Sequence, residues 1–295
     1  AVILGEHARR GSFRPVGGEL KFGEGQTLPS LSLPLEDGRT MLIHGRIDRV
    51  DRADGECGTL IRIIDYKSSR TSLRLPELYY GISLQLLIYL DVVLTHAPTW
   101  LGRAAQPAGA LYFHVHNPVI AGKNALSPEK ARAEWNKRFK MRGLVLSDKE
   151  AVLLMDKGLE HAGGTSTVIP VAIKSDGQFY KSSSVATLRQ WNHLRNYVRK
   201  MAGKIGNGIA KGDVRIAPYR LARKVPCETC AYKAVCQFDP LIAGNEYRQF
   251  APLDKETVWR LIEQEAGVAV HLDERVQGTD RTDGNQREGD GNHGS

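Results

Sequence analysis

Two β-rich runs joined by a short turn constrain the fold of this chain more than any other feature. Residues 41–51 and 59–67 are rich in β-forming side chains, and a turn containing Asp and Gly separates them. So short a connection can join only antiparallel neighbours, so the runs predict two adjacent antiparallel strands. Residues 78–94 are apolar nearly all round, which is typical of a buried helix. Strands flanking a buried helix predict an α/β core.

The rest of the chain divides by composition and periodicity. Strand-like residues 110–116 follow a loop containing Pro107 and Gly109, and 128–140 and 149–158 favour helices. Apolar residues recur every three or four positions from Val185 to Ile209, which predicts an amphipathic helix that Gly212 ends. The predicted organisation is an irregular lead-in at 1–40 with an edge strand near Glu19 to Phe22, a core at 41–212, a cysteine segment at 213–250, a short helix at 251–267 and a disordered tail at 268–295.

Charge and hydropathy bound the class of protein. The 295 residues carry a net charge of +8, which favours a polyanionic partner. Apolar stretches are shorter than the roughly 20 residues of a membrane span, and no signal peptide is visible. The chain begins at Ala1 without a charged leader, so we expect that an upstream part is missing here. Four cysteines, three of them close together, are too few for a disulfide-stapled fold of this size and favour a reducing compartment, so we expect a cytoplasmic protein.

Two carboxylates and a lysine are predicted to converge at the end of the strand pair. Alternation along 59–67 puts Asp65 and Lys67 on one face, and an antiparallel hairpin brings Asp48 beside Asp65. Two close carboxylates repel unless a cation neutralises them, which implies Mg²⁺ or Mn²⁺. Such an ion activates water, and a lysine stabilises charge on a phosphate. The alternative is a surface ion pair at a strand end.

A glutamine and a tyrosine lie on one face of the helix that follows. Gln85 interrupts the apolar run, and a buried amide needs a hydrogen-bond partner. Tyr89 lies one turn further on the same face. Their position after the Asp-x-Lys strand favours an active-site role, and the alternative is that they tie down a loop.

Three cysteines are concentrated within ten residues. Cys227, Cys230 and Cys236 have spacings that favour a metal site in a reducing compartment. Zinc and a 4Fe-4S cluster both take four ligands, and the spacing does not distinguish them. Cys57 lies in the turn between the two strands and is a poor fourth ligand.

Two other groups have a structural and a functional interpretation. His114 and His116 alternate onto one strand face, but we interpret them as structural or surface residues. The basic stretch 128–140 carries Trp135 and Phe139 among its lysines and arginines, and either follows a DNA backbone or is a solvated helix.

The order of these motifs resembles the RecB-like branch of the PD-(D/E)xK nucleases. The resemblance rests on Glu19 with Phe22-Gly23, then on residues 45–51, 64–69 and 80–90. It implies a restriction-endonuclease-like α/β core with a mixed sheet flanked by helices. It implies metal ligation by Asp48 and Asp65, a catalytic role for Lys67 and a trailing helix motif formed by Gln85 and Tyr89. Glu19 is similar to the first acidic motif, which makes it a candidate metal ligand.

The cysteine segment resembles that of the B subunits of bacterial AddAB helicase-nucleases. In that family three C-terminal cysteines and one upstream cysteine hold a 4Fe-4S cluster, so the resemblance assigns this role to Cys227, Cys230 and Cys236, with the fourth ligand absent from this chain. It places the cluster site in a helical C-terminal lobe. It further implies a Mg²⁺-dependent deoxyribonuclease, an exonuclease that acts 5′ to 3′ on single strands. The implied partners are single- and double-stranded DNA and an AddA-like helicase-nuclease subunit, with which the protein would act in double-strand break repair.

Two rival interpretations remain. A stand-alone RecB-like iron-sulphur exonuclease of the CRISPR-adaptation type would share the chemistry, but the missing upstream part argues against it. A non-catalytic DNA-binding scaffold with a zinc or iron-sulphur knot would be expected to have lost one of Asp48, Asp65 and Lys67. No phosphate-binding loop of the form Gly-x-x-x-x-Gly-Lys-Ser/Thr occurs, so a helicase or ATPase site must lie elsewhere.

Overall fold

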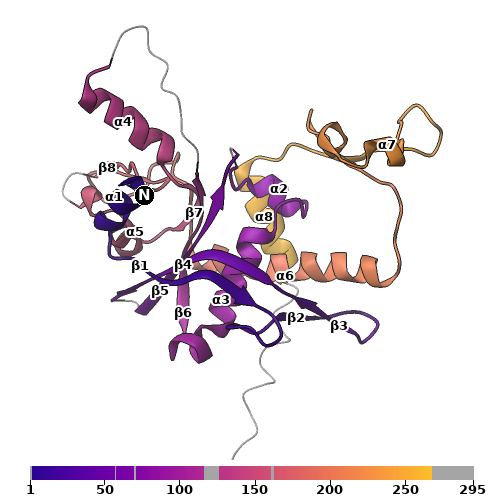
Figure 1. Ribbon diagram of the computed structural model, residues 1–295, viewed down its shortest axis with the longest axis horizontal. Coiled ribbons are helices and arrows are strands. Elements are labelled where there is room, and N and C mark those ends of the chain that lie inside the picture. Colours follow the sequence, from indigo (N-terminus) through magenta and orange to yellow (C-terminus); the bar gives the residue numbers. More distant parts are fainter. Residues whose placement is uncertain (1, 57, 70, 116–125, 161–162, 268–295) are drawn as a thin grey trace, which may run out of the picture.

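A mixed sheet is the centre of the protein. The computed structural model describes residues 2–56, 58–69, 71–115, 126–160 and 163–267. Six of its strands form one sheet in the order β1-β4-β5-β6-β7-β10 (Figure 1). They are β1 (Arg14–Phe22), β4 (Gly45–Gly55), β5 (Gly58–Lys67), β6 (Ala105–His114), β7 (Arg142–Leu146) and β10 (Val185–Ala186). The β5–β6 and β7–β10 pairs are parallel and the others antiparallel, so the predicted mixed α/β core is confirmed.

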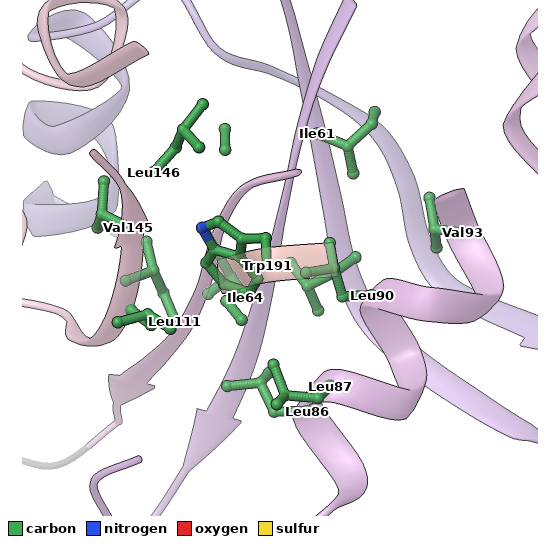
Figure 2. Close-up of a cluster of buried hydrophobic side chains, with 14 of the residues drawn as sticks. Ile61, Ile64, Leu86, Leu87, Leu90, Val93, Leu111, Val145, Leu146 and Trp191 are labelled. Atoms are coloured by element: carbon green, nitrogen blue, oxygen red, sulfur yellow. The ribbon is translucent and has the colours of Figure 1, made fainter. Parts of the chain in front are cut away.

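Helices surround this sheet, and α3 and α5 contact its strands directly. These helices are α1 (Val2–Arg9), α2 (Leu75–Tyr79), α3 (Gln85–Leu101), α4 (Pro128–Phe139), α5 (Lys149–Met155), the 3₁₀ turn η1 (Lys157–Leu159) and α6 (Leu188–Ala210). Helix α6 starts with a capping box in which Thr187 and Gln190 satisfy each other's backbone N–H groups. Its Trp191 is fully buried in a cluster that includes Leu90 and Val145 (Figure 2).

The first forty residues are more regular than the irregular lead-in predicted from the sequence. They contain α1, the nine-residue strand β1 and strand β2 (Leu31–Pro34), which forms a hairpin with β3 (Thr40–Ile43). The edge strand predicted near Glu19 to Phe22 is confirmed as the end of β1, which lies at the edge of the sheet. The sequence does not predict the start of this strand, because Pro15, Gly17 and Gly18 weaken the strand pattern. Pairing with β4 supplies the hydrogen bonds that local propensity does not, so tertiary structure determines this strand.

The predicted helix at 78–94 is two helices. A bend after α2 passes through Gly81, whose φ of +74° suits glycine, and α3 then starts at Gln85. An uninterrupted apolar run does not reveal such a break. Strand β6 likewise starts earlier than predicted: Pro107 and Gly109 lie within it, where its register against β5 shifts between Ile61 and Arg62.

A small C-terminal lobe follows α6. Its elements are β11 (Tyr219–Leu221), the 3₁₀ turn η2 (Pro226–Thr229), α7 (Lys233–Cys236), β12 (Arg248–Phe250) and α8 (Lys255–Ala266). The two-residue strands β8 (Gly164–Thr165) and β9 (Ala172–Ile173) precede α6 and belong to the core. Strands β11 and β12 pair in parallel, and α8 packs against α6 and α2 (Figure 1). The tail predicted at 268–295 lies outside the described residues. None of the described helices has the length and apolar character needed to cross a membrane.

Candidate active site

The β4–β5 hairpin brings Asp48 to Asp65. Its register pairs Arg49 with Ile64, which puts Asp48 level with Asp65. The carboxylate Oδ2 of Asp48 accepts a hydrogen bond of 2.8 Å from the backbone N–H of Tyr66, so Asp48 is held against β5. Asp65 is only 3% exposed. Two carboxylates therefore converge at the end of the hairpin, as the sequence predicts.

Lys67 connects these carboxylates to helix α3. Its Nζ lies 2.7 Å from Oδ2 of Asp65 and donates a hydrogen bond of 3.3 Å to Oε1 of Gln85. The same Nζ lies 5.8 Å from the centre of the Tyr112 ring. Tyr112 is the partner of Asp65 in the parallel β5–β6 pair. The local sequence pattern does not reveal Tyr112, because only that pairing, which joins distant segments, brings it to the site.

Gln85 and Tyr89 extend this chain of contacts. Nε2 of Gln85 donates a hydrogen bond of 2.9 Å to the Tyr89 hydroxyl, and the Tyr89 ring meets Phe22 edge to face at 5.8 Å. The predicted pairing on one helix face is thus observed. The expectation of a buried amide is wrong, because Gln85 is the exposed first residue of α3. Together Asp48, Asp65, Lys67, Gln85 and Tyr89 form what is called here the carboxylate-lysine site.

Protonation at this site follows from burial and neighbouring charge. Burial raises the pKa of Asp65, the hydrogen bond and charge of Lys67 oppose that rise, and the Asp48 charge adds to it. Burial lowers the pKa of Lys67, but the hydrogen bond and charge of Asp65 outweigh it, so the net pKa is raised. Lys67 is therefore a cation at neutral pH. It is suited to stabilising negative charge rather than to accepting a proton.

The two carboxylates suit a hard divalent cation. Oδ2 of Asp65 is buried and lies 2.7 Å from Nζ of Lys67. A buried carboxylate that interacts with a lysine and senses the charge of a second carboxylate, Asp48, is a suitable ligand for such an ion. Among the described residues no three His, Cys, Asp or Glu side chains are grouped to hold a metal. The residues thus fit an ion bound by one or two carboxylates together with water and phosphate oxygens, which is the usual arrangement for Mg²⁺.

Glu19 is not grouped with these carboxylates. The β1–β4 register places it level with Asp48, but its φ of +50° lies in the left-handed region, which changes the direction of its side chain. Its carboxylate is 63% exposed and pairs with Arg46 at 2.8 Å. A pattern of residue types gives no sign of this backbone conformation, so the sequence could not predict the outcome.

A second charge system occupies the opposite face of the hairpin. Arg62, which is buried, donates two hydrogen bonds to Oδ2 of Asp51, and Arg49 binds both oxygens of the same carboxylate. Arg62 also lies 4.7 Å from the centre of the Phe13 ring. His7 of α1 lies near Arg62, and burial, followed by the charge of Arg62, lowers the pKa of His7 to about 4. Strand alternation separates this network from Asp65 and Lys67.

The cysteines lie apart from this site in the C-terminal lobe. Cys227 and Cys236 are partly exposed and Cys230 is exposed, and all three are free thiols. Within the described part of the chain the three thiols are not assembled around one centre. Cys57 lies outside the described residues. The three cysteines predicted to bind a cluster therefore lie in the C-terminal lobe, but among the described residues their thiols are not arranged to bind one metal centre.

The remaining candidates divide between structure and surface. His114 is buried, and its Nε2 interacts with the backbone of Thr71, which agrees with a structural role. His116 lies outside the described residues. The basic stretch forms α4, in which Phe139 is buried and stacks on Phe113 while the other residues are exposed or partly exposed.

Comparison with known proteins identifies the class. The family model of the PD-(D/E)XK nuclease superfamily matches residues 2–237. The chain therefore belongs to the PD-(D/E)XK nuclease superfamily, and the predicted membership is confirmed.

Curated relatives narrow the comparison further. The B subunit of an ATP-dependent helicase/deoxyribonuclease of Oceanobacillus iheyensis is 46% identical over 264 residues, which are 89% of this chain and 22% of the relative. Proteins of the same name from Geobacillus thermodenitrificans and Listeria monocytogenes are 48% and 43% identical, over 87% and 90% of the chain and 22% and 23% of the relative. The chain thus spans about a fifth of the length of these relatives.

Proposed function

We propose that this chain is the DNA-cleaving domain of an AddAB-type helicase-nuclease and hydrolyses phosphodiester bonds with Mg²⁺ or Mn²⁺. The observation that carries the proposal is the convergence of Asp48, Asp65 and Lys67 from two strands. A helix carrying Gln85 lies against them. Superfamily membership and the names of the relatives support it.

The proposed chemistry assigns a role to each residue of the site. Asp48 and Asp65 would hold the divalent ion, which when bound supplies a water of lowered pKa as nucleophile. Lys67 stabilises the charge that develops on the phosphate oxygens and orients the attacking water. Gln85 fixes Lys67 through the hydrogen bond to its Nζ, and Tyr89 fixes Gln85. No covalent intermediate with the protein is required. Glu19 remains a candidate ligand if the β1 backbone adjusts when DNA binds.

The proposal is tested by cleavage of end-labelled single-stranded DNA with Mg²⁺. Asp65→Ala and Lys67→Ala should each lower the rate by about a hundredfold or more while the circular dichroism spectrum is kept. Asp176→Ala, which changes an exposed carboxylate in the loop after β9, is the matched control and should cut at the parent rate. Undiminished cutting by both site variants would show that the assigned site is wrong.

The strand preference is a separate part of the proposal. We propose an exonuclease that degrades single strands 5′ to 3′ as a helicase partner of the AddA type releases them, in a cytoplasmic complex that repairs double-strand breaks. Circular single-stranded DNA should then resist degradation, and a 5′ label should be released before a 3′ label. Cleavage of the circle would instead indicate an endonuclease.

The cysteine segment supports a proposed 4Fe-4S cluster of the longer protein. Thiolates are the ligands that such a cluster requires, and three of four are present at Cys227, Cys230 and Cys236. Their separation in the structure means that the segment must close to bind a cluster. Iron and acid-labile sulphide in the protein purified without oxygen would support the cluster, whereas zinc alone would indicate a zinc site.

A further inference from the structure

A groove lies between the C-terminal lobe and helix α6. It has a volume of about 800 Å³ and is referred to here as the C-terminal groove. Its walls come from the bend after α2, from α6 and from β11 and β12, with Glu265 of α8 at one side. Gly81 is part of this wall, and a Cβ there would lie 3.2 Å from the side chain of Met201. The absence of a side chain therefore lets the bend pack closely on α6.

One wall of the groove is aromatic. The rings of Tyr80 and Phe250 are stacked with centres 4.2 Å apart and planes within 3° of parallel. Tyr219 is stacked with Phe250 at 5.8 Å, and Tyr79 is stacked with Tyr197 at 5.6 Å. The hydroxyl of Tyr80 donates to the backbone carbonyl of Ala251, which fixes the ring. Five rings thus lie around one cavity, and Tyr80, Tyr219 and Phe250 among them are partly exposed. Partly exposed aromatic rings suit contact with the bases of nucleic acid.

The edge of the groove has excess positive charge. Lys200 pairs with Glu265 at 3.6 Å and Arg215 pairs with Asp213 at 2.6 Å, so these four charges cancel. Lys204 and Arg248 also line the groove, and neither forms an ion pair within the described part of the chain. Nε of Arg248 donates to the Ala217 carbonyl, which orients the guanidinium without neutralising it. Two cations beside an aromatic wall complement a phosphate backbone with unpaired bases.

The groove includes the chain segment that immediately precedes helix α3 of the carboxylate-lysine site. Ile82 lines the groove, and only Ser83 and Leu84 separate it from Gln85, which contacts Lys67. We propose that the C-terminal groove binds single-stranded DNA, with bases against the aromatic wall and phosphates at Lys204 and Arg248, and guides the strand to the nuclease site. This inference rests on the proposed function, because it gives the substrate strand a path to that site.

Binding without cleavage tests the groove directly. The probe is a fluorescein-labelled oligothymidylate of about 20 nucleotides, followed by anisotropy with the purified protein in EDTA. Lys204→Glu should raise Kd about five- to tenfold, because it reverses a charge at the phosphate path. The matched control is Lys157→Glu in η1, an exposed lysine next to α5 on the other side of the molecule from α6 (Figure 1), and its Kd should stay at the parent value.

A second measurement separates stacking from charge. An oligonucleotide of the same length without bases should bind the parent about fivefold or more weakly than oligothymidylate. Phe250→Leu should reduce that difference and leave affinity for the abasic strand unchanged. Equal affinity of the parent for both strands, or an unchanged Kd in Lys204→Glu, would overturn the inference.

The two proposals fail in different ways. If Lys204→Glu binds DNA normally while Asp65→Ala loses cleavage, the groove is wrong and the nuclease assignment stands. If Lys204→Glu weakens binding while Asp65→Ala cuts normally, the groove binds DNA and the catalytic assignment is wrong.

Discussion

The buried ring of His7 predicts a loss of stability in mild acid. Its Nδ1 has no hydrogen-bond partner among the described residues, and its ring meets Phe113 edge to face at 5.8 Å. Burial, with Arg62 and Arg10 nearby, lowers its pKa to about 4 from 6.5, while the charges of Asp156 and Glu6 oppose that shift. The folded state therefore binds fewer protons than the unfolded state between these two values. Stability should fall as pH falls through this window.

The magnitude follows from the pKa difference. A pKa lowered from 6.5 to about 4, at about 1.4 kcal/mol per pH unit, corresponds to a loss of about 3 kcal/mol in the free energy of unfolding. This loss is absent at pH 7 and nearly complete at pH 4. His7→Phe keeps an aromatic ring beside Phe113 and removes the titrating group. The free energy of unfolding of this variant, relative to the parent, should therefore rise by about 3 kcal/mol between neutral pH and pH 4.

Urea denaturation at a series of pH values measures this difference. Carboxylates near His7 also titrate in acid, but they are present in both proteins, so the comparison largely removes their contribution. Parallel curves for parent and variant would refute the reasoning, and would mean that water reaches the His7 ring in the folded state or that α1 opens at low cost.

Two substitutions test packing around the site. Gly45→Ala puts a Cβ 3.0 Å from two atoms of the buried Phe22 ring. It should lower the free energy of unfolding, measured in urea, by about 1 to 3 kcal/mol and should reduce the cleavage rate. The control Gly18→Ala, which has open space around it, should change neither quantity. Asp91→Asn removes the charge of a buried carboxylate that pairs with Arg195 and Arg199, and should cost about 3 kcal/mol by the same assay. A loss below about 1 kcal/mol would show that solvent compensates these partly exposed arginines.

Local pattern predicts the two strands of the carboxylate-lysine site but not the other elements that complete it. Asp48, Asp65 and Lys67 could be assigned because a short hairpin and strand alternation determine their relative positions. Tyr112 could not, because it reaches Lys67 through a parallel strand that starts forty residues later. The sequence predicts the correct helix face for Gln85 but a buried side chain, whereas Gln85 is exposed at the start of α3. The bend at Gly81 that precedes α3 cannot be predicted, because the apolar run continues through it.

The buried network on the far face explains why the hairpin register is well determined. Asp51 lies directly opposite Arg62, and their side chains are bonded on the face that meets α1, while Asp65 and Lys67 point to the face that meets α3. A slip by one residue would turn Arg62 toward the apolar side of α3 and separate it from Asp51. Because an unpaired buried charge costs several kcal/mol, that slip is strongly disfavoured. The Asp51–Arg62 pair thus acts at a distance from the chemistry: it selects the one register in which Asp48 and Asp65 face each other.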